Sequence, residues 1–360
     1  MAASPPRHFL FSLLIFSTFL LLLLPPIISA ANGPRQLHHL PDDSDSDIDS
    51  DINAGPRIKN HRIRRAYLAL QAMKKAIHSD PSTPPPTDLN GADIAGHLPS
   101  QLGLLTDAAL IHLNSNRFCG VVPKTLSRLS LLHELDLSNN RLVGPFPSVV
   151  LGMRALRYLD LRYNDFEGAL PEELFEKNID AVFLNDNRFD SNIPQSLGSS
   201  PASAVILANN RFVGCVPTSI GEMSNTLNEI LLHGNRLSGC LPSEIGQLGN
   251  VTVFDASYNH FTGAVPETFA GLRNVEELDL GHNVFTGVLP GAVCNLPKLK
   301  NLTFSHNFFR GKSSGCSSKW KARAQTQAGT ISTAVVAKNN PYPCFSPDVA
   351  KATAISGAVP

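Results

Sequence analysis

The chain has 360 residues, of which 42% are apolar and 17% are charged, so it is long enough to bury a sizeable core. Thirty basic residues balance thirty acidic ones, and this balance supplies no general attraction to nucleic acid or to an anionic membrane. Six cysteines in a chain of this length do not make a disulfide scaffold by themselves, and their role depends on the compartment.

Residues 1–30 have the layout of a secretory signal peptide. Arg7 and His8 precede an apolar run over 9–24, and Ile28-Ser29-Ala30 offers a small-residue cleavage end. An uncleaved signal anchor is the alternative, although the apolar run is shorter than the roughly 20 residues that a membrane span needs. No later stretch approaches that length, so we expect the rest of the chain to be soluble and secreted, where disulfides persist.

Residues 31–56 are expected to be a disordered acidic segment, because 42–51 carry six aspartates and almost nothing to bury. Residues 57–87 are predicted to form a basic capping helix followed by a Pro-rich linker. We expect one helix face to pack on the end of the domain that follows. That face is made of Ile63, Tyr67, Leu70, Lys74 and Ile77.

Residues 88–311 are built from a repeat of the form L-x-L-x-x-N-x-L-x-G-x-I-P, with tolerated replacements. The closing proline recurs every 23 to 25 residues, at Pro99, Pro123, Pro147, Pro171, Pro194, Pro217, Pro242, Pro266 and Pro290. The motif asparagine keeps the same period, at Asn116, Asn140, Asn164, Asn187, Asn210, Asn235, Asn259, Asn283 and Asn307. The first repeat has Ala92 in its place, and the tenth loses the proline. Such a period predicts a solenoid.

Each position of the motif has a physical role. The paired leucines, such as Leu135 and Leu137, point inward from a short strand, and the asparagine bonds backbone groups of adjoining turns. Glycines such as Gly144 permit a tight bend. No repeat can bury its leucines alone, so the repeats stack about 4.8 Å apart. The predicted fold is an α/β repeat: a right-handed leucine-rich-repeat solenoid of about ten repeats, with a parallel β-sheet on the concave face and an N-terminal capping helix.

The closing L-x-G-x-I-P resembles the plant-type leucine-rich repeats of receptor ectodomains and polygalacturonase inhibitors. Several longer strings are similar to the N-terminal domain of the leucine-rich repeat extensin family. They are ADIAG (92–96), NSNRFCG (114–120), ELDLSNNR (134–141), LDLRYN (159–164), ILANNRF (206–212), NVTVFD (250–255) and, in the helix, AYLALQA (66–72). The resemblance implies a cell-wall protein whose repeat domain captures basic rapid alkalinization factor peptides and pairs into homodimers.

Two features depart from that family. Its members carry a long Ser-Pro-rich extensin tail, whereas residues 312–360 form a low-complexity tail without Ser-Pro runs, so the chain is similar to extensin-less relatives. The family also has a cysteine-containing capping segment between the helix and the first repeat, and here 80–87 lead almost directly into Leu89. Either this chain caps itself differently, or an exon is missing from the sequence.

Four cysteines are disulfide candidates. Cys215 and Cys240 each follow the repeat glycine in successive repeats, so we expect their Cα atoms to lie one repeat apart, within the about 4.4–6.8 Å that a disulfide accepts. A disulfide between them is predicted, with two buried free thiols as the alternative. Cys294 and Cys316 are predicted to seal the C-terminal end of the solenoid.

The remaining cysteines leave alternatives open. Cys119 has no partner in its own column and is either free, paired with Cys344, or bridged to a second chain. No cysteine or histidine spacing predicts zinc or another metal, and no cofactor is expected. Two glycosylation acceptors, Asn250 and Asn301, fall where a repeat begins, and a glycan there would limit how a partner approaches.

The motif aims three side chains of each repeat onto the inner face: the residue between the paired leucines and the two residues before the asparagine. These columns predict a ligand-binding surface with an apolar strip, rimmed by aspartates and tyrosines. Its members are Asp136, Asp160, Arg162, Tyr163, Phe183, Asp186, Ile206, Leu231, His233, Asp255, Tyr258, Asp279 and His282. The acidic rim suits a cationic partner.

A separate column of arginines lies one residue past the motif asparagine, at Arg117, Arg141, Arg188, Arg211 and Arg236. It indicates either a ladder for pectin or another polyanion, or ordinary pairing with neighbouring aspartates, and the second interpretation is favoured. No catalytic residues are predicted, because the sequence has no nucleophile elbow or phosphate loop and an open solenoid face encloses no pocket.

The sequence therefore predicts a secreted wall protein that is not an enzyme and that binds a basic secreted peptide on its concave face. Pectin or another wall polymer and a second copy of the chain are further expected partners, whereas nucleic acid is not. A defence protein like the polygalacturonase inhibitors and a structural apoplastic wall protein are the alternatives.

Overall fold

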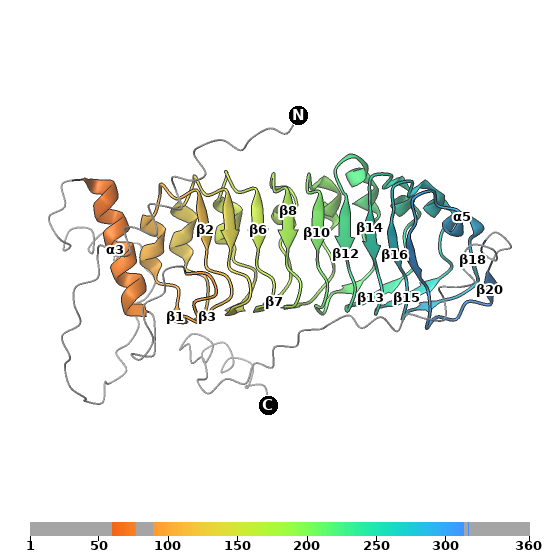
Figure 1. Ribbon diagram of the computed structural model, residues 1–360, viewed down its shortest axis with the longest axis horizontal. Helices are drawn as coiled ribbons and strands as arrows, with labels where there is room; N and C mark the ends of the chain where they lie inside the picture. Colours follow the sequence, from red (N-terminus) through yellow and green to blue (C-terminus); the bar gives the residue numbers. More distant parts are fainter. Residues whose placement is uncertain (1–59, 77–88, 313–315, 317–360) are drawn as a thin grey trace, which may run out of the picture.

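The computed structural model describes residues 60–76, 89–312 and 316. The predicted signal peptide, the acidic segment, most of the linker and nearly all of the tail lie outside these residues, as do Ile77 and Cys344. The described part is an elongated stack of repeats with a helix at its N-terminal end (Figure 1). The predicted solenoid is confirmed.

One long parallel sheet runs the length of the solenoid and takes its nine strands in sequence order (Figure 1). Each strand is three residues long, and each pairs in register with the strand of the next repeat. The strands are β2 (Leu110–His112), β4 (Glu134–Asp136), β6 (Tyr158–Asp160), β8 (Ala181–Phe183), β10 (Ala204–Ile206), β12 (Glu229–Leu231), β14 (Val253–Asp255), β16 (Glu277–Asp279) and β19 (Asn301–Thr303).

Outer strands of two to four residues follow the motif asparagine position of the repeats and also pair in parallel. They are β1 (Ala95–His97), β3 (Arg117–Gly120), β5 (Arg141–Gly144), β7 (Asp165–Gly168), β9 (Arg188–Phe189), β11 (Val213–Gly214), β13 (Arg236–Gly239), β15 (His260–Gly263), β17 (Val284–Phe285), β18 (Val288–Leu289) and β20 (Gly311–Lys312).

A short helical turn completes the repeat on the side opposite the long sheet. Most of these turns begin directly after the closing proline, whose fixed φ suits the first turn of a helix. They are η1 (Ser100–Leu104), η2 (Lys124–Arg128), α4 (Val149–Gly152), η3 (Glu172–Leu174), η4 (Gln195–Ser199), η5 (Thr218–Asn225), η6 (Ser243–Gln247), η7 (Glu267–Gly271) and α5 (Gly291–Cys294).

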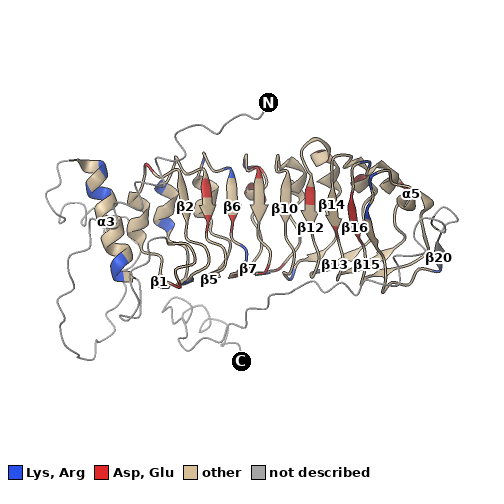
Figure 2. Cartoon of the chain, in the orientation of Figure 1, with Lys and Arg blue, Asp and Glu red and all other residues tan. Residues whose placement is uncertain are grey.

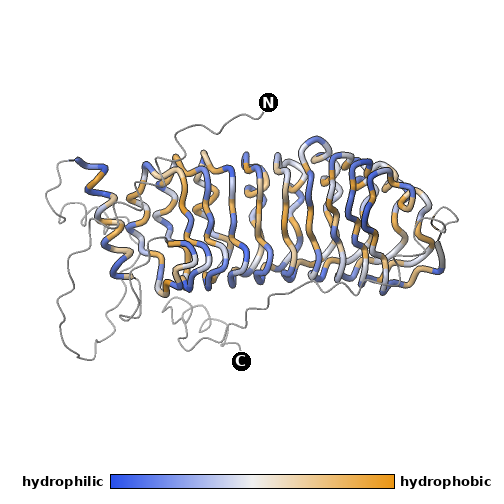
Figure 3. The backbone as a smooth tube through the Cα atoms, viewed as in Figure 1, coloured by the Kyte–Doolittle hydropathy of each residue, from blue (hydrophilic) through white to orange (hydrophobic). Residues whose placement is uncertain are grey.

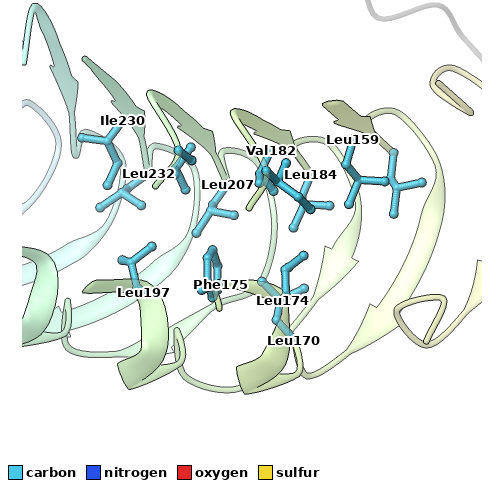
Figure 4. Packing of buried hydrophobic residues seen from close by; sticks show 14 of the residues in the cluster. Leu159, Leu170, Leu174, Phe175, Val182, Leu184, Leu197, Leu207, Ile230 and Leu232 are labelled. Atoms are coloured by element: carbon cyan, nitrogen blue, oxygen red, sulfur yellow. The ribbon is translucent and has the colours of Figure 1, made fainter. Parts of the chain in front are cut away.

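The core lies between the long sheet and the helical turns. Leucines from the strand side, such as Leu159 and Leu207, point toward Phe175 and Leu197 from the helical side (Figure 4). Figure 3 shows the resulting alternation of apolar and polar positions along each repeat. Phenylalanines two residues past the asparagine form a second layer, with ring centroids 6.2 Å apart for Phe166 and Phe189.

The motif asparagines form a buried ladder along the solenoid. The Asn140 side-chain amide donates to the carbonyl oxygens of Leu113 (2.8 Å) and Leu137 (3.1 Å), and its Oδ1 accepts from the Phe118 backbone nitrogen (3.0 Å). The same contacts recur in the following repeats, for example at Asn164. Since these backbone groups lie inside the protein, the asparagine satisfies polar atoms that would otherwise be unpaired. The predicted role of this residue is confirmed.

The outer strands pair with an offset of two motif positions, and this offset overturns the predicted Cys215–Cys240 disulfide. Val213 and Gly214 lie opposite Arg236 and Leu237, so Cys215 lies beside Ser238 and Gly239 rather than beside Cys240. One strand spacing and two residues along the strand together separate the two cysteines by about 8 Å, too far for a disulfide. Both are free thiols and both are exposed.

The same offset explains the glycine of the motif. A Cβ added at Gly239 would lie 2.6 Å from the Cys215 Sγ, because the cysteine side chain reaches over this glycine. Gly239 also has a φ of +75°, which L-residues rarely adopt. The repeat therefore needs glycine here for two independent reasons.

Both ends of the stack are covered. Helix α3 (His61–Ala76) packs against η1 at the N-terminal end (Figure 1). Its buried residues are Ala69 and Met73, and Ile63 is exposed, so the predicted contact face was wrong. The side of the helix that carries Ala66, Ala69 and Met73 packs on the first repeat instead, because these side chains join the apolar core at the end of the stack. At the other end Cys294 and Cys316 form the predicted disulfide, with Cα atoms 5.1 Å apart. Cys119 is also disulfide-bonded, which excludes a free thiol there.

Candidate functional site

The predicted site residues lie on the outward side of the long sheet, which is the predicted concave face and keeps that name below. The period of the strands explains their positions. In β4, Leu135 is fully buried while Glu134 and Asp136 on either side face outward. The outward face therefore has a column that the sequence analysis missed, formed by the first residue of each strand. An alternating pattern read one step further back would have found it. Its members are Leu110, Glu134, Tyr158, Ala181, Ala204, Glu229, Val253, Glu277 and Asn301.

Two acidic groups lie on this face, and the first spans β4 and β6. We name it the N-terminal acidic group, formed by Glu134, Asp136 and Asp160. Figure 2 shows acidic positions in red on several strands of the long sheet. Glu134 accepts from His112 at 3.1 Å. Asp136 accepts from the Asn114 side-chain amide at 2.8 Å. These neighbours hold the two carboxylates in place.

Asp160 is the most unusual carboxylate of the face, since its side chain is fully buried. Its Oδ2 lies 3.1 Å from the Arg162 Nε and accepts from the Tyr158 hydroxyl at 3.3 Å. Burial raises the pKa of Asp160 to about 6, assisted by the nearby charge of Asp136 and opposed by Arg162. Burial and the adjacent Asp160 also raise the pKa of Tyr158 to about 12, so this hydroxyl keeps its proton.

The second acidic group spans β12 to β16. We name it the C-terminal acidic group, formed by Glu229, Asp255, Glu277 and Asp279. Burial raises the pKa of Asp279 to about 6, with a contribution from the charge of Asp255. Asp255 pairs with His233, whose Nδ1 lies 3.0 Å from the Asp255 Oδ2.

The His233–Asp255 pair shifts both partners toward their charged forms. Burial opposes the charge on each, but the hydrogen bond and charge of Asp255 outweigh it and raise the pKa of His233. Hydrogen bonds from His233 and Ser257 likewise overcome burial and lower the pKa of Asp255. A histidine with a raised pKa beside a carboxylate forms an ion pair with it and is not a free acid.

An apolar strip separates the two acidic groups. Phe183, Ile206 and Leu231 occupy one column of β8, β10 and β12, and the adjacent column has Ala181 and Ala204. The Phe183 ring packs 5.4 Å from the Tyr158 ring, and the Arg162 guanidinium lies over it at 5.3 Å. The predicted strip therefore exists, and only Ile206 within it is largely buried.

The residue before each motif asparagine has a left-handed backbone. Tyr163, Asp186, Tyr258 and His282 all have φ between +52° and +56°. Asp186 accepts from the side-chain amides of Asn185 (2.8 Å) and Asn209 (3.0 Å). Tyr163 and Tyr258 are among the most exposed large side chains of the described residues.

Three rings of that column stack near the C-terminal end. Tyr258 and His282 lie 4.1 Å apart between centroids, and His282 and His306 lie 3.9 Å apart. Burial in this stack, with the charge of His306, lowers the pKa of His282. The structure thus adds His306 to the predicted Tyr258 and His282.

The two glycosylation acceptors differ in position. Asn301 is exposed and is the first residue of β19, so a glycan there would stand on the outward face of the sheet, next to Glu277. Asn250 is exposed in the turn before β14, outside the strand. Only the first would limit access to the concave face directly.

The arginine column is partly paired with aspartates, as the favoured interpretation predicts. Arg117 lies 2.7 Å from Asp93, and Arg188 lies 2.8 Å from Asp165. Arg211 and Arg236 are exposed on successive repeats and make no ion pair with the described residues.

Residues 60–76, 89–312 and 316 contain neither a cluster of metal ligands nor a helix that could cross a membrane. No three His, Cys, Asp or Glu side chains there are grouped as metal ligands would be. Within the same ranges no helix has the length and apolar character that a bilayer crossing requires.

The fold and its outward sheet face define a leucine-rich-repeat domain of the kind found in plant receptor ectodomains. A leucine-rich-repeat family model matches residues 109–166 and 250–309, and a second one matches 226–248. The Arabidopsis receptor kinase HAESA, solved with the peptide hormone IDA and the co-receptor SERK1, has a TM-score of 0.60 at 25% identity, over 72% of this chain and 46% of that one. The plant peptide hormone receptor RGFR1, solved with RGF2, has a TM-score of 0.59 at 26% identity, over 61% and 35%.

Curated relatives narrow the class to one family. Leucine-rich repeat extensin-like protein 7 of Arabidopsis thaliana is 57% identical over 279 residues, which cover 69% of this chain and 62% of that protein. Leucine-rich repeat extensin-like protein 1 of the same plant is 54% identical, over 60% and 33%. The chain thus spans less than two thirds of either relative. Its repeat domain is a leucine-rich-repeat domain of the plant leucine-rich repeat extensin-like type.

Proposed function

We propose that this protein is a secreted cell-wall protein that captures a basic signalling peptide on the concave face of its long sheet. The observation that carries the proposal is the charge of that face. Its four outward columns contain one arginine or lysine, Arg162, against eight carboxylates. The carboxylates are Glu134, Asp136, Asp160, Asp186, Glu229, Asp255, Glu277 and Asp279.

This charge is local, because the whole chain is neutral. A concentrated acidic surface attracts cationic partners and orients them before contact. Relatives by fold, RGFR1 and HAESA, were solved with peptide hormones, which supports a peptide as the partner. The family resemblance implies rapid alkalinization factor peptides, which are basic, and we propose this class as the ligand.

Calorimetric titration of the purified protein with a rapid alkalinization factor peptide tests the proposal. We expect binding that weakens as salt rises, since charged groups dominate the contact. No heat at tens of micromolar peptide, with a folded protein, would overturn it. The double variant E229Q/E277Q should weaken binding roughly tenfold, because it removes two carboxylates from the face.

A matched control separates the face from general charge. The double variant E222Q/E267Q removes two exposed carboxylates from η5 and η7, on the opposite side of the solenoid. It should bind the peptide like the unchanged protein. If both double variants weaken binding equally, the attraction is not located on the concave face.

A polyanionic wall polymer is a second candidate partner, favoured by Arg211 and Arg236. Arg236 is the first residue of β13, Arg211 lies just before the neighbouring strand β11, and pectin carries repeated carboxylates. Retention on a pectin column should fall in R211Q/R236Q and persist in R117Q, whose arginine is already paired. Inhibition of a polygalacturonase by the purified protein would instead support a defence role.

A further inference from the structure

We infer that the concave face selects a sequence pattern in its ligand: one apolar side chain midway between two basic residues about six positions apart, in a chain that crosses the strands. This inference rests on the proposed capture of a basic peptide and adds the spacing that the peptide must have. It follows from the order of side chains along a single column of the sheet.

The register of the sheet supplies the distance. Glu134, Tyr158, Ala181, Ala204 and Glu229 are consecutive partners on β4, β6, β8, β10 and β12. Four strand spacings of about 4.8 Å place the two glutamates, one from each acidic group and both partly exposed, about 19 Å apart. An extended peptide advances about 3.3 Å per residue, so it covers that distance in about six residues.

The strip between the two glutamates suits an apolar side chain. No charged residue occupies the outward positions of β8 or β10, and Ala181 and Ala204 are the smallest outward side chains of the sheet strands. The Arg162 guanidinium already lies over the Phe183 ring, and a lysine or arginine of the ligand placed over Ile206 would lose hydration without gaining a counter-charge. An apolar side chain placed there loses nothing and buries apolar surface against the strip.

The two ends of the pattern are unequal. The N-terminal acidic group has three carboxylates and is partly neutralised by Arg162, which is paired with Asp160. The C-terminal acidic group has four carboxylates and only the His233 imidazole beside them. The ligand should therefore carry more positive charge at the end that lies over β14 and β16.

A series of synthetic peptides with one composition tests the spacing. Each carries two Lys-Lys pairs and one leucine midway between them in a Gly-Ser background, with the pairs two, six or ten residues apart. Calorimetry with the unchanged protein should show the six-residue spacing binding at least tenfold more tightly than the other two. Equal affinity for all three would overturn the inference and leave the proposed function standing. If the protein bound none of these peptides and also failed to bind a rapid alkalinization factor peptide, both the inference and the proposed function would be overturned.

A pair of variants locates the apolar contact. Ala204→Lys puts a positive charge into the strip, and it should remove most of the advantage of the six-residue spacing. Ala270→Lys makes the same change at an exposed position of η7, on the helical side, and should leave that advantage intact. An unaltered preference in A204K, with a thermal midpoint close to that of A270K, would contradict the position that we assign.

Discussion

The buried asparagine ladder and the concave face are built from the same repeats, yet they vary in opposite ways. Asn140, Asn164 and Asn187 make one set of backbone contacts with almost unchanged distances. The column on the outer side of the same strands changes from aspartate to phenylalanine, isoleucine and leucine, and then back to aspartate. Uniform contacts stack the repeats, and the stacked repeats are then free to differ in what they display.

The largest effect on stability is expected when one asparagine of the buried ladder is removed. Asn187→Ala removes the donor to the Leu161 and Leu184 carbonyls and the acceptor for the Phe166 backbone nitrogen, all of them buried. The unpaired groups should lower the free energy of unfolding by about 3–5 kcal/mol. Urea unfolding monitored by circular dichroism measures this change. Asn228→Ala, at an exposed position, is the control and should cost less than about 0.5 kcal/mol.

The side chains on the outward face of the sheet should affect stability differently from the asparagine ladder, and Asp160 gives the clearest test. Its pKa in the folded protein, about 6, lies above the ordinary 3.8, so the folded chain binds the proton more tightly than the unfolded chain. The stability that protonated Asp160 contributes at low pH is therefore lost as the pH rises from about 4 to 7. Relative to the unchanged protein, Asp160→Asn should gain up to about 3 kcal/mol across that range. A stability difference that stays constant from pH 4 to pH 7 would contradict the buried carboxylate.

Two glycines compare a crowded repeat with an open one. Gly239 and Gly168 share a positive φ, but only Gly239 lies under a neighbouring side chain, Cys215. Gly168→Ala should cost about 1 kcal/mol for backbone strain, and Gly239→Ala about 1–2 kcal/mol more for the contact. Thermal unfolding gives both values. Adding Cys215→Ala to Gly239→Ala should recover the excess, and failure to do so would refute the two-position offset.

The smallest effect is expected at the two exposed cysteines. Because Cys215 and Cys240 are free, the double variant C215S/C240S should unfold within about 1 °C of the unchanged protein. Both thiols should react with a maleimide in the folded state, as measured by peptide mass spectrometry. A peptide pair linked through Cys215 and Cys240 in a non-reducing digest would show that our assignment is wrong.

The sequence predicted most of what repeats and little of what depends on the offset between repeats. The period of the prolines and asparagines was enough for the solenoid, the buried ladder and the outward columns. The Cys215–Cys240 prediction failed because it assumed that equal motif positions lie side by side, which holds for the long sheet but not for the outer strands. The predicted contact face of helix α3 was wrong for another reason. The spacing of apolar residues within the helix does not say which side of it meets the first repeat.

The candidate site was predicted in outline and incomplete in detail. Periodicity placed Asp255 and His233 on one face but gave no sign of their 3.0 Å contact. Glu229 and Glu277 were missed because they precede the motif rather than lie within it. The shift in the pKa of Asp160 depends on burial in the stacked repeats and on the charge of Asp136 from the neighbouring strand β4, and no single repeat contains that information.

The in-register pairing of the long sheet has a consequence for how such domains diversify. Every strand added or removed between the two acidic groups changes their separation by one step of about 4.8 Å. The core contacts on either side of the change are rejoined unchanged. The distance between the two acidic groups can therefore change only in steps of one whole repeat. Duplication or loss of one repeat between β4 and β12 would change the length of ligand that is measured by one to two residues, without any new fold.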